Sequence, residues 1–206
     1  QAAITAAERG HKVTLFEKRD KLGGIMGFTE FDAIKKDTFR YLNYLIDRVK
    51  KLNINVCLNT EATFEIVEAA RPYAVIAAVG AEPVCPDIKG IEKACHVLDA
   101  YEKRSAIGDK IVIIGGGLAG CEAALCFAKE KKDVTVLEIG DKIARDANIR
   151  LFGSLMDFVE RYGVKIMTNA RCVEITREGV IVDRENQKEF IKADSVLYAV
   201  GMTARR

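Results

Sequence analysis

The sequence predicts an α/β protein built from two domains of one architecture, each with parallel strands joined by crossover helices. Three observations predict this fold class: an internal repeat, helical patterns that alternate with short apolar runs, and a glycine-rich turn between one such run and a helix. The chain has 206 residues, of which 49% are hydrophobic and 30% are charged. This balance is typical of folded globular domains and unlike that of disordered chains.

In the first half, an Ala-rich helical pattern over residues 1–8 precedes an apolar strand over 13–16, which ends at Glu17. Strands are also expected over 55–59 and 74–80. Between them, apolar residues recur at helical spacing and predict one face of an amphipathic helix: Leu42, Leu45, Ile46, Val49 and Leu52.

The second half repeats this order, with an apolar strand over 134–137 that ends at Glu138. A helical face (Phe152, Leu155, Val159 and Tyr162), a strand over 165–169 and an apolar run over 196–201 follow. The offset is 121 positions both between the glutamates (138 − 17) and between the glycines that end the last runs (201 − 80). A hairpin, 173–175 with 180–182, is the extra element of this half.

Two of the three prolines, Pro83 and Pro86, mark the crossing between the halves, because proline ends a strand and favours extended chain. We therefore expect domains over residues 1–84 and 85–206.

A glycine-rich turn follows the continuous apolar strand over 110–114 and precedes the helix around 121–128. Its GxGxxG glycines are predicted to allow a tight turn (Gly115), close approach of a pyrophosphate to the backbone (Gly117) and close packing of helix against strand (Gly120). The backbone N–H groups at the start of a helix then attract phosphates. The expected site residues of this turn are Gly115, Gly116, Gly117, Leu118, Ala119 and Gly120.

Glu138 ends the next strand, 18 residues past Gly120, where a carboxylate accepts hydrogen bonds from a ribose diol. Its charge repels a 2′-phosphate, and the residues that follow it directly, Ile139, Gly140 and Asp141, are not cationic. We therefore expect a Rossmann-like site for NADH rather than NADPH. Glu122 either faces the nicotinamide side or lies in the first turn of the helix, where acids are favoured.

The first half carries Glu17 as a second expected ribose ligand, but its glycine turn would fall just before Gln1. We therefore expect a chain cut from a longer protein, with the first dinucleotide-binding domain truncated at its N-terminus and a GxGxxG turn ending one or two residues upstream. Gly23 and Gly24 form either a simple turn or a loop that brings backbone near a second phosphate or a flavin edge.

These motifs together resemble the flavoproteins with two dinucleotide-binding domains, and among them the C-terminal half of old yellow enzyme relatives, the group of 2,4-dienoyl-CoA reductase, NADH:flavin oxidoreductase and trimethylamine dehydrogenase. The resemblance covers nearly the whole chain and rests on the segments 16–18, 22–24, 78–83, 115–120 and 199–201. It implies FAD (or ADP) in the first domain and NAD(P)H in the second, within three-layer Rossmann-like domains. It also implies an N-terminal barrel with FMN and an iron–sulfur cluster in the parent protein, outside these residues.

The resemblance also implies cofactor contacts for particular residues. In the first domain these are Glu17, Lys18, Leu22, Gly23, Gly24, Ala62, Val79 and Gly80, and in the second domain the corresponding last turn lies at Gly201. Val79 stands where the family has Thr, so a side-chain hydroxyl contact is lost there.

These features predict an NADH-dependent flavin oxidoreductase in which hydride passes from NADH to FAD and on to an acceptor outside the chain. No side-chain acid or base is needed, so no catalytic residue is assigned. One alternative is a non-catalytic ADP-binding module that docks an electron-transfer partner. A disulfide reductase of the same fold is a weaker alternative, because residues 25–28, after the glycine pair, contain no cysteine.

Overall fold

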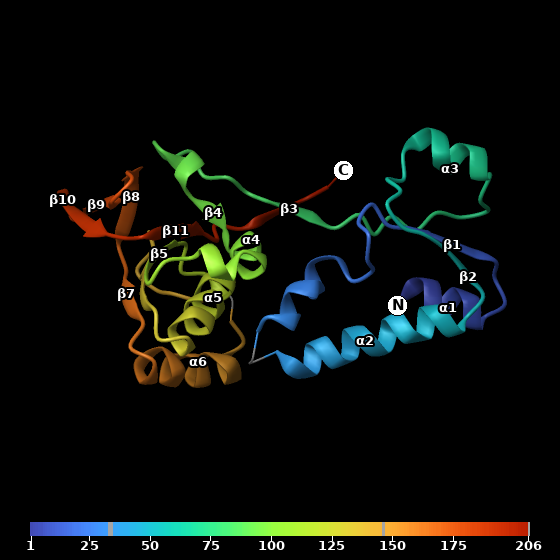
Figure 1. The fold of residues 1–206 in the computed structure, drawn as a ribbon, viewed down its shortest axis with the longest axis horizontal. Coiled ribbons are helices and arrows are strands. Elements are labelled where there is room, and N and C mark those ends of the chain that lie inside the picture. The colour runs from blue at the N-terminus through green and yellow to red at the C-terminus, as the bar shows by residue number, and fades with distance from the viewer. Residues whose placement is uncertain (33–34, 146, 206) are drawn as a thin grey trace. The chain divides into compact units, whose positions relative to one another are not determined.

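The computed structural model describes residues 1–32, 35–145 and 147–205. The chain divides into two compact units, unit 1 (Gln1–Gly80) and unit 2 (Ala81–Arg205). The elements of both are labelled in Figure 1. Among the described residues, no helix has both the length and the apolar character that crossing a bilayer requires.

Unit 1 contains two short parallel strands together with helices. Helix α1 (Ala2–Glu8) leads into β1 (Val13–Phe16), and a 3₁₀ segment η1 (Gly24–Glu30) precedes α2 (Lys36–Lys51). Strand β2 (Ile54–Cys57) pairs in parallel with β1, and α3 (Phe64–Ala70) follows. Helix α2 buries Leu42 and Val49, two members of the predicted apolar face.

The strand predicted over 74–80 is wrong for this structure, because these residues form no strand and are all exposed. Their counterpart in the repeat is β11 (Ser195–Tyr198), which pairs with two neighbours and buries Leu197 completely. Among its described residues, unit 1 has no strand equivalent to the central neighbour of β11. Among the described residues, the apolar run over 74–80 therefore lacks the counterpart of β5 (Lys110–Ile114), a strand with which β11 pairs in unit 2.

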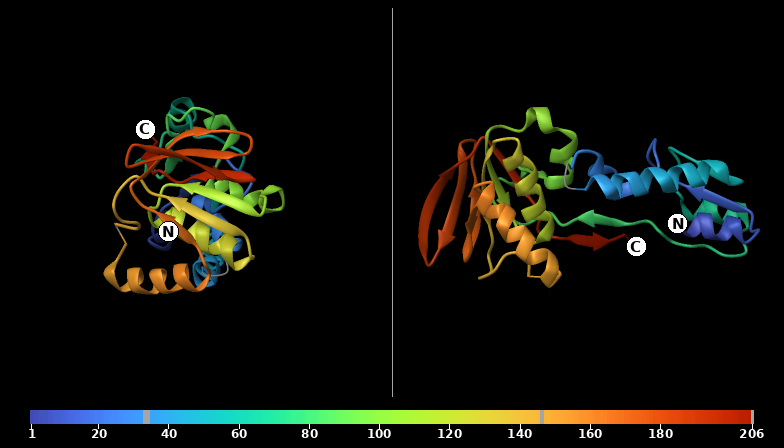
Figure 2. Two further views of the ribbon diagram at one scale, coloured as in Figure 1. Left: turned by 90° about the vertical axis from the view of Figure 1, so that its left-hand side faces the viewer. Right: turned by 90° about the horizontal axis from the view of Figure 1, so that it is seen from below.

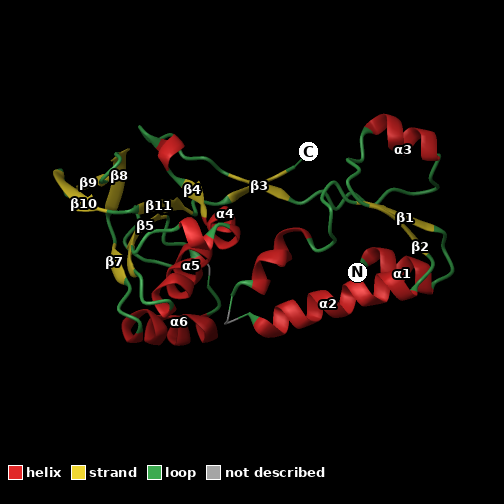
Figure 3. Cartoon of the chain, viewed as in Figure 1, coloured by secondary structure: helices red, strands yellow, loops and turns green. Residues whose placement is uncertain are grey.

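Unit 2 is built on a five-stranded parallel sheet with the order β4-β11-β5-β6-β7. The strands other than β11 are β4 (Cys95–His96), β5 (Lys110–Ile114), β6 (Asp133–Leu137) and β7 (Lys165–Met167). Helix α5 (Leu118–Lys129) connects β5 to β6, and α6 (Ile149–Arg161) connects β6 to β7 (Figure 3). Short helical segments lie at α4 (Val97–Glu102), η2 (Ile91–Lys93) and η3 (Arg104–Ala106).

A three-stranded antiparallel sheet forms the next layer, with β8 (Ala170–Ile175), β9 (Gly179–Arg184) and β10 (Gln187–Lys192). Alternate residues of β5, Val112 and Ile114, pack in one buried cluster with Val180 and Val182 of β9. The helices lie on the opposite side of the parallel sheet (Figure 2). These layers confirm the predicted α/β class with a Rossmann-like parallel sheet.

Several strands of unit 2 lie outside the expected pattern. Strand β3 (Ala81–Pro83) pairs antiparallel with β12 (Met202–Ala204). The predicted hairpin is confirmed as β8 and β9, but β10 extends it into a third strand that the sequence did not suggest. The apolar face predicted on α6 is only partly confirmed, because Leu155 and Val159 are buried while Phe152 and Tyr162 stay exposed.

Candidate nucleotide-binding site

The glycine-rich turn joins β5 to α5 within unit 2. Gly115 has a φ of +107° and donates its N–H to the carbonyl of Leu137 over 2.8 Å. A Cβ at this position would lie 2.4 Å from the carbonyl oxygen of Ala199. The predicted tight turn is therefore present, and only glycine fits it.

The other two glycines of the motif differ in the space around them, which is crowded at Gly120 and open at Gly117. A Cβ on Gly120 would lie 2.0 Å from the carbonyl oxygen of Gly115, so the first turn of α5 lies directly against the loop. A Cβ on Gly117 would meet nothing within 4 Å. Gly117 is the residue before α5, and no side chain caps that helix. The backbone at Gly117 thus borders open space.

Both backbone polar groups of Gly116, its N–H and its carbonyl, form hydrogen bonds. Its N–H donates to Glu138 Oε2 at 2.8 Å, and its carbonyl accepts the N–H of Ala144 at 2.7 Å. The thiol of Cys121 lies 3.4 Å from the same carbonyl. With Gly116 engaged in this way, the N–H groups that remain for a ligand include those of Gly117, Leu118 and Ala119, at a helix start that has no internal acceptors for them.

Glu138 follows β6 and is fixed by two backbone N–H groups. Gly116 donates to Oε2, and Gly140 donates to Oε1 at 2.7 Å. The N–H of Glu138 itself donates to the carbonyl of Met167 at 2.8 Å. A carboxylate has about four lone-pair sites, so two remain for the two hydroxyls of a ribose. The structure thus brings the predicted acid directly beside the predicted glycine turn.

The thiol of Cys121 lies beneath this turn and is completely buried. Burial raises the pKa of Cys121 to about 12, and the negative charges of Glu138 and Glu122 add to the rise. The thiol therefore stays protonated at neutral pH and keeps its hydrogen for the carbonyl of Gly116. Cys121 and Cys126 are buried, as expected of core residues.

Glu122 does not lie in the first turn of α5, which corrects one of the two readings of this residue. The helix begins at Leu118, inside the glycine motif, and has no acid in its first turn. The sequence pattern placed the start at Cys121, because glycine has low helix propensity. Glu122 is half-buried one turn further along.

In unit 1, Glu17 occupies the place that Glu138 has in unit 2, directly after a parallel strand. Its N–H donates to the carbonyl of Cys57 at 2.9 Å, and its Oε1 accepts the N–H of Arg19 at 2.9 Å. Lys18 and Leu22 lie in the following loop, and both glycines that end this loop have positive φ, +125° for Gly23 and +53° for Gly24.

The remaining first-domain candidates are exposed: Ala62, Val79 and Gly80. Among the described residues, no glycine-rich turn lies beside Glu17 as one does beside Glu138. In its described residues, unit 1 thus has an acid after a parallel strand and a glycine loop, but not the turn that lies beside Glu138 in unit 2. Gly201, at the end of the last run of unit 2, has a φ of +117° and is exposed.

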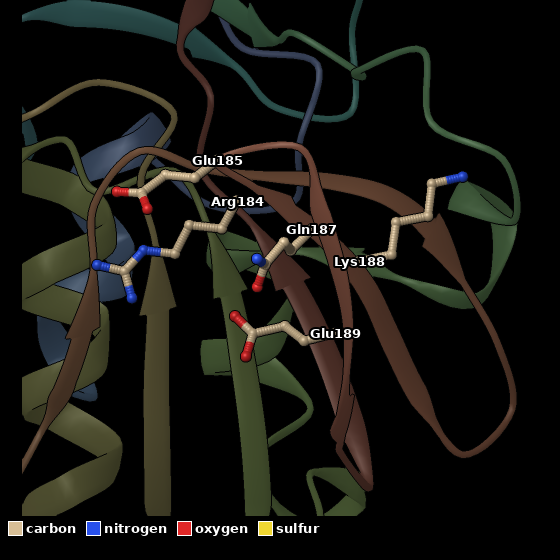
Figure 4. Close-up of a pocket in the computed structure, with 5 residues that line it drawn as sticks. All are labelled: Arg184, Glu185, Gln187, Lys188 and Glu189. Carbon is tan, nitrogen blue, oxygen red and sulfur yellow. The ribbon is translucent and has the colours of Figure 1, made fainter.

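A pocket lies elsewhere in unit 2, at the turn between β9 and β10 (Figure 4). It is lined by Arg184, Glu185, Gln187, Lys188 and Glu189, none of which belongs to the predicted site. Among the described residues, no group of three or more His, Cys, Asp or Glu side chains is placed to hold a metal ion.

The comparisons with known proteins agree on the class of protein to which the chain is similar, the oxidoreductases. A family model described as pyridine nucleotide-disulphide oxidoreductase matches residues 1–206. Similar curated proteins include a bilirubin reductase of Mediterraneibacter gnavus (strain CC55_001C), 33% identical over 98% of this chain and 32% of that protein. An NADH oxidase of Thermoanaerobacter brockii is 35% identical, again over 98% of this chain and 32% of that protein.

Among solved structures, a 2-naphthoyl-CoA reductase in complex with 2-naphthoyl-CoA superposes with a TM-score of 0.90 at 35% identity, over 97% of this chain and 31% of that one. A histamine dehydrogenase from Rhizobium sp. 4-9 shares the fold, with a TM-score of 0.80 at 18% identity over 98% of this chain and 34% of that one. The chain spans about a third of the length of these relatives. It belongs to the pyridine nucleotide-disulphide oxidoreductase family of flavoproteins, oxidoreductases that bind FAD and NAD(P)H.

Proposed function

We propose that the chain is the nucleotide-binding part of a flavin-dependent oxidoreductase, and that unit 2 binds the NADH whose hydride passes to a flavin. The observation that carries this proposal is the arrangement at the start of α5. An open glycine backbone, an uncapped helix start and a carboxylate fixed by two N–H groups lie side by side there.

Each part of this arrangement matches one part of a dinucleotide. The N–H groups of Gly117, Leu118 and Ala119 are suited to the pyrophosphate, because the helix start is the positive end of the helix dipole. The free lone pairs of Glu138 are suited to the adenosine ribose. When bound, the coenzyme supplies a hydride from its nicotinamide ring. The residues of the chain hold and orient the coenzyme, so no catalytic acid or base is assigned.

The first domain, proposed over residues 1–84, is assigned the flavin nucleotide (FAD or ADP), and residues 85–206 are assigned NADH. Glu17 supports this assignment, because it follows a parallel strand as Glu138 does, and because its Oε2 accepts no hydrogen bond from the described residues. The final acceptor, and the barrel domain with its FMN and iron–sulfur cluster, belong to the proposed parent protein.

A disulfide reductase is the less favoured function. The glycine pair at the expected redox position runs into the 3₁₀ segment η1 (Gly24–Glu30), which contains no cysteine. Cys121 and Cys126, the closest pair along the sequence, are both buried and are not joined by a disulfide. Burial also raises the pKa of Cys172, to about 11. A thiol held protonated in this way is a poor nucleophile for a disulfide.

Calorimetric titration with NADH tests the proposal, by comparing the wild-type chain with the Gly117→Ala variant. We expect NADH to bind the wild-type chain, and we expect Gly117→Ala to weaken binding at least about tenfold, because its methyl group enters the space of the pyrophosphate. Hydride transfer is tested in the proposed parent protein, by following the bleaching of its FAD absorbance by NADH under anaerobic conditions. Absence of NADH binding, or equal binding by the variant, would contradict the proposed site.

A further inference from the structure

The loop that follows Glu138 folds back onto the glycine turn. The N–H of Ala144 donates to the carbonyl of Gly116, and Ile143 is buried against the same residue. A Cβ on Gly116 would lie only 2.9 Å from Cγ2 of Ile143. Ile143 and Ala144 therefore lie against the glycine turn, although they come after the strand and the acid that complete the sequence motif.

This loop brings a cation close to the acid. A Cβ on Gly140 would lie 3.0 Å from Nη2 of Arg145 and 3.1 Å from Oε1 of Glu138. The guanidinium and the carboxylate are thus no more than about 6 Å apart, a bound set by these two distances. Arg145 forms an ion pair with Asp141, and its side chain is 59% exposed, so it is open to a ligand at this edge of the site.

Glu138 and Arg145 favour opposite coenzymes. Glu138 is held in one orientation by Gly116 and Gly140, so it does not turn away from a 2′-phosphate, which its charge repels. The planar guanidinium of Arg145 is suited to bind a phosphate through two parallel hydrogen bonds. In the sequence, no cationic residue follows Glu138 directly. Arg145 comes near Glu138 only because the loop folds back.

We propose that Arg145 is a specificity-determining residue, the cation of a latent 2′-phosphate site whose occupancy Glu138 suppresses. This inference rests on the proposed function, since it assumes that the adenosine ribose lies at Glu138. It assigns the choice between NADH and NADPH to two residues that face each other across Gly140. Removing the charge of Glu138 then gives NADPH affinity without introducing a new cation.

Titration calorimetry with NADPH and NADH on four variants of the full chain tests this. Glu138→Ser is expected to raise NADPH affinity at least about tenfold over the wild type. The double variant Glu138→Ser with Arg145→Ala is expected to lose that gain. Lys142, the other cation of the loop, gives the matched control, since Glu138→Ser with Lys142→Ala should keep the gain. Arg145→Ala alone should bind NADH within about twofold of the wild type.

The outcomes separate this inference from the proposed function. If the wild-type chain binds neither nucleotide, the proposed function fails. If it binds NADH but Glu138→Ser gains no NADPH affinity, the role of Arg145 is wrong while the site stands. Equal loss in the Arg145 and Lys142 double variants would also overturn the role of Arg145, because it would show a general effect of charge. Melting curves of each variant confirm that the fold is intact.

Discussion

At the scale of single residues, Gly117 and Gly120 belong to one motif but have different roles. Gly120 is needed for packing, because its Cα faces the carbonyl of Gly115, whereas Gly117 borders open space. Sequence spacing alone predicted both roles, since each follows from the strand, turn and helix order of the motif. The close contact at Gly120 agrees with its predicted packing role, and the binding role of Gly117 stays a prediction.

We predict that Gly120→Ala lowers the free energy of unfolding by at least about 2 kcal/mol, because a buried methyl group placed against a backbone atom forces the helix away from the loop. Thermal unfolding followed by circular dichroism measures this as a lower melting temperature. Gly117→Ala is the control: its φ of −63° suits alanine, so its melting temperature should match or exceed that of the wild type. A Gly120→Ala variant that melts like the wild type would show that the close contact is absent.

The residues that hold the site together were harder to predict than the glycines. Glu138 was found because it ends a strand at the expected distance from the motif. The N–H groups that fix it, and the return of Arg145 toward it, depend on a loop whose path has no periodic sequence signal. Ala144 illustrates this, because it adopts a φ of +46°, which alanine seldom does.

At the scale of secondary-structure elements, the buried strands and the long helices were predictable and the exposed strands were not. Strand β5 matches its apolar run residue for residue, since a strand buried on both faces is continuously apolar. Strand β10 is polar and almost fully exposed, so its composition resembles a loop. Strand β3 ends at Pro83, a residue that usually argues against a strand.

The junction of β4 and α4 provides a prediction about pH. His96 is buried, caps α4 by accepting the N–H of Leu98 at 3.3 Å, and packs edge-on against Tyr198. Burial lowers the pKa of His96 below its usual 6.5, although the charge of Asp99 opposes this. A lowered pKa contributes stability that is present above the unfolded pKa and is lost as the pH falls through the folded value.

We therefore expect the free energy of unfolding to decrease as the pH falls from about 7 toward 5. Urea titrations at several pH values measure this. His96→Asn is the control, because asparagine keeps a capping oxygen but does not titrate, so its unfolding free energy should change less over the same range. A slope that is the same in both proteins would assign the pH effect to other groups.

At the scale of the whole molecule, the internal repeat predicted the order of elements in both halves. It did not predict which of the expected strands form. The offset of 121 residues pairs the run over 74–80 with β11, yet only β11 is a strand. The difference is physical: strand formation needs a paired edge, and β5 provides it in unit 2. A sequence pattern reports the tendency to form a strand and not the presence of its neighbour.

This difference predicts unequal hydrogen exchange in the two halves. Amides over 74–79 should exchange at least about a hundred times faster than those over 196–199, where Tyr198 pairs with strands on both sides. Mass spectrometry of deuterated peptides resolves the two segments in one experiment. Slow exchange over 74–79 would mean that this run is paired in solution.

The central claim is that a dinucleotide binds on the backbone at the start of α5, with Glu138 on its ribose. Nuclear magnetic resonance of the ¹⁵N-labelled chain tests this most directly, by following backbone amides as NADH is added. The account predicts the largest shifts at Gly117, Leu118 and Ala119, saturating with NADH concentration and strongly reduced in Gly117→Ala. Unchanged amides at these three residues, or shifts confined to another part of the chain, would contradict it.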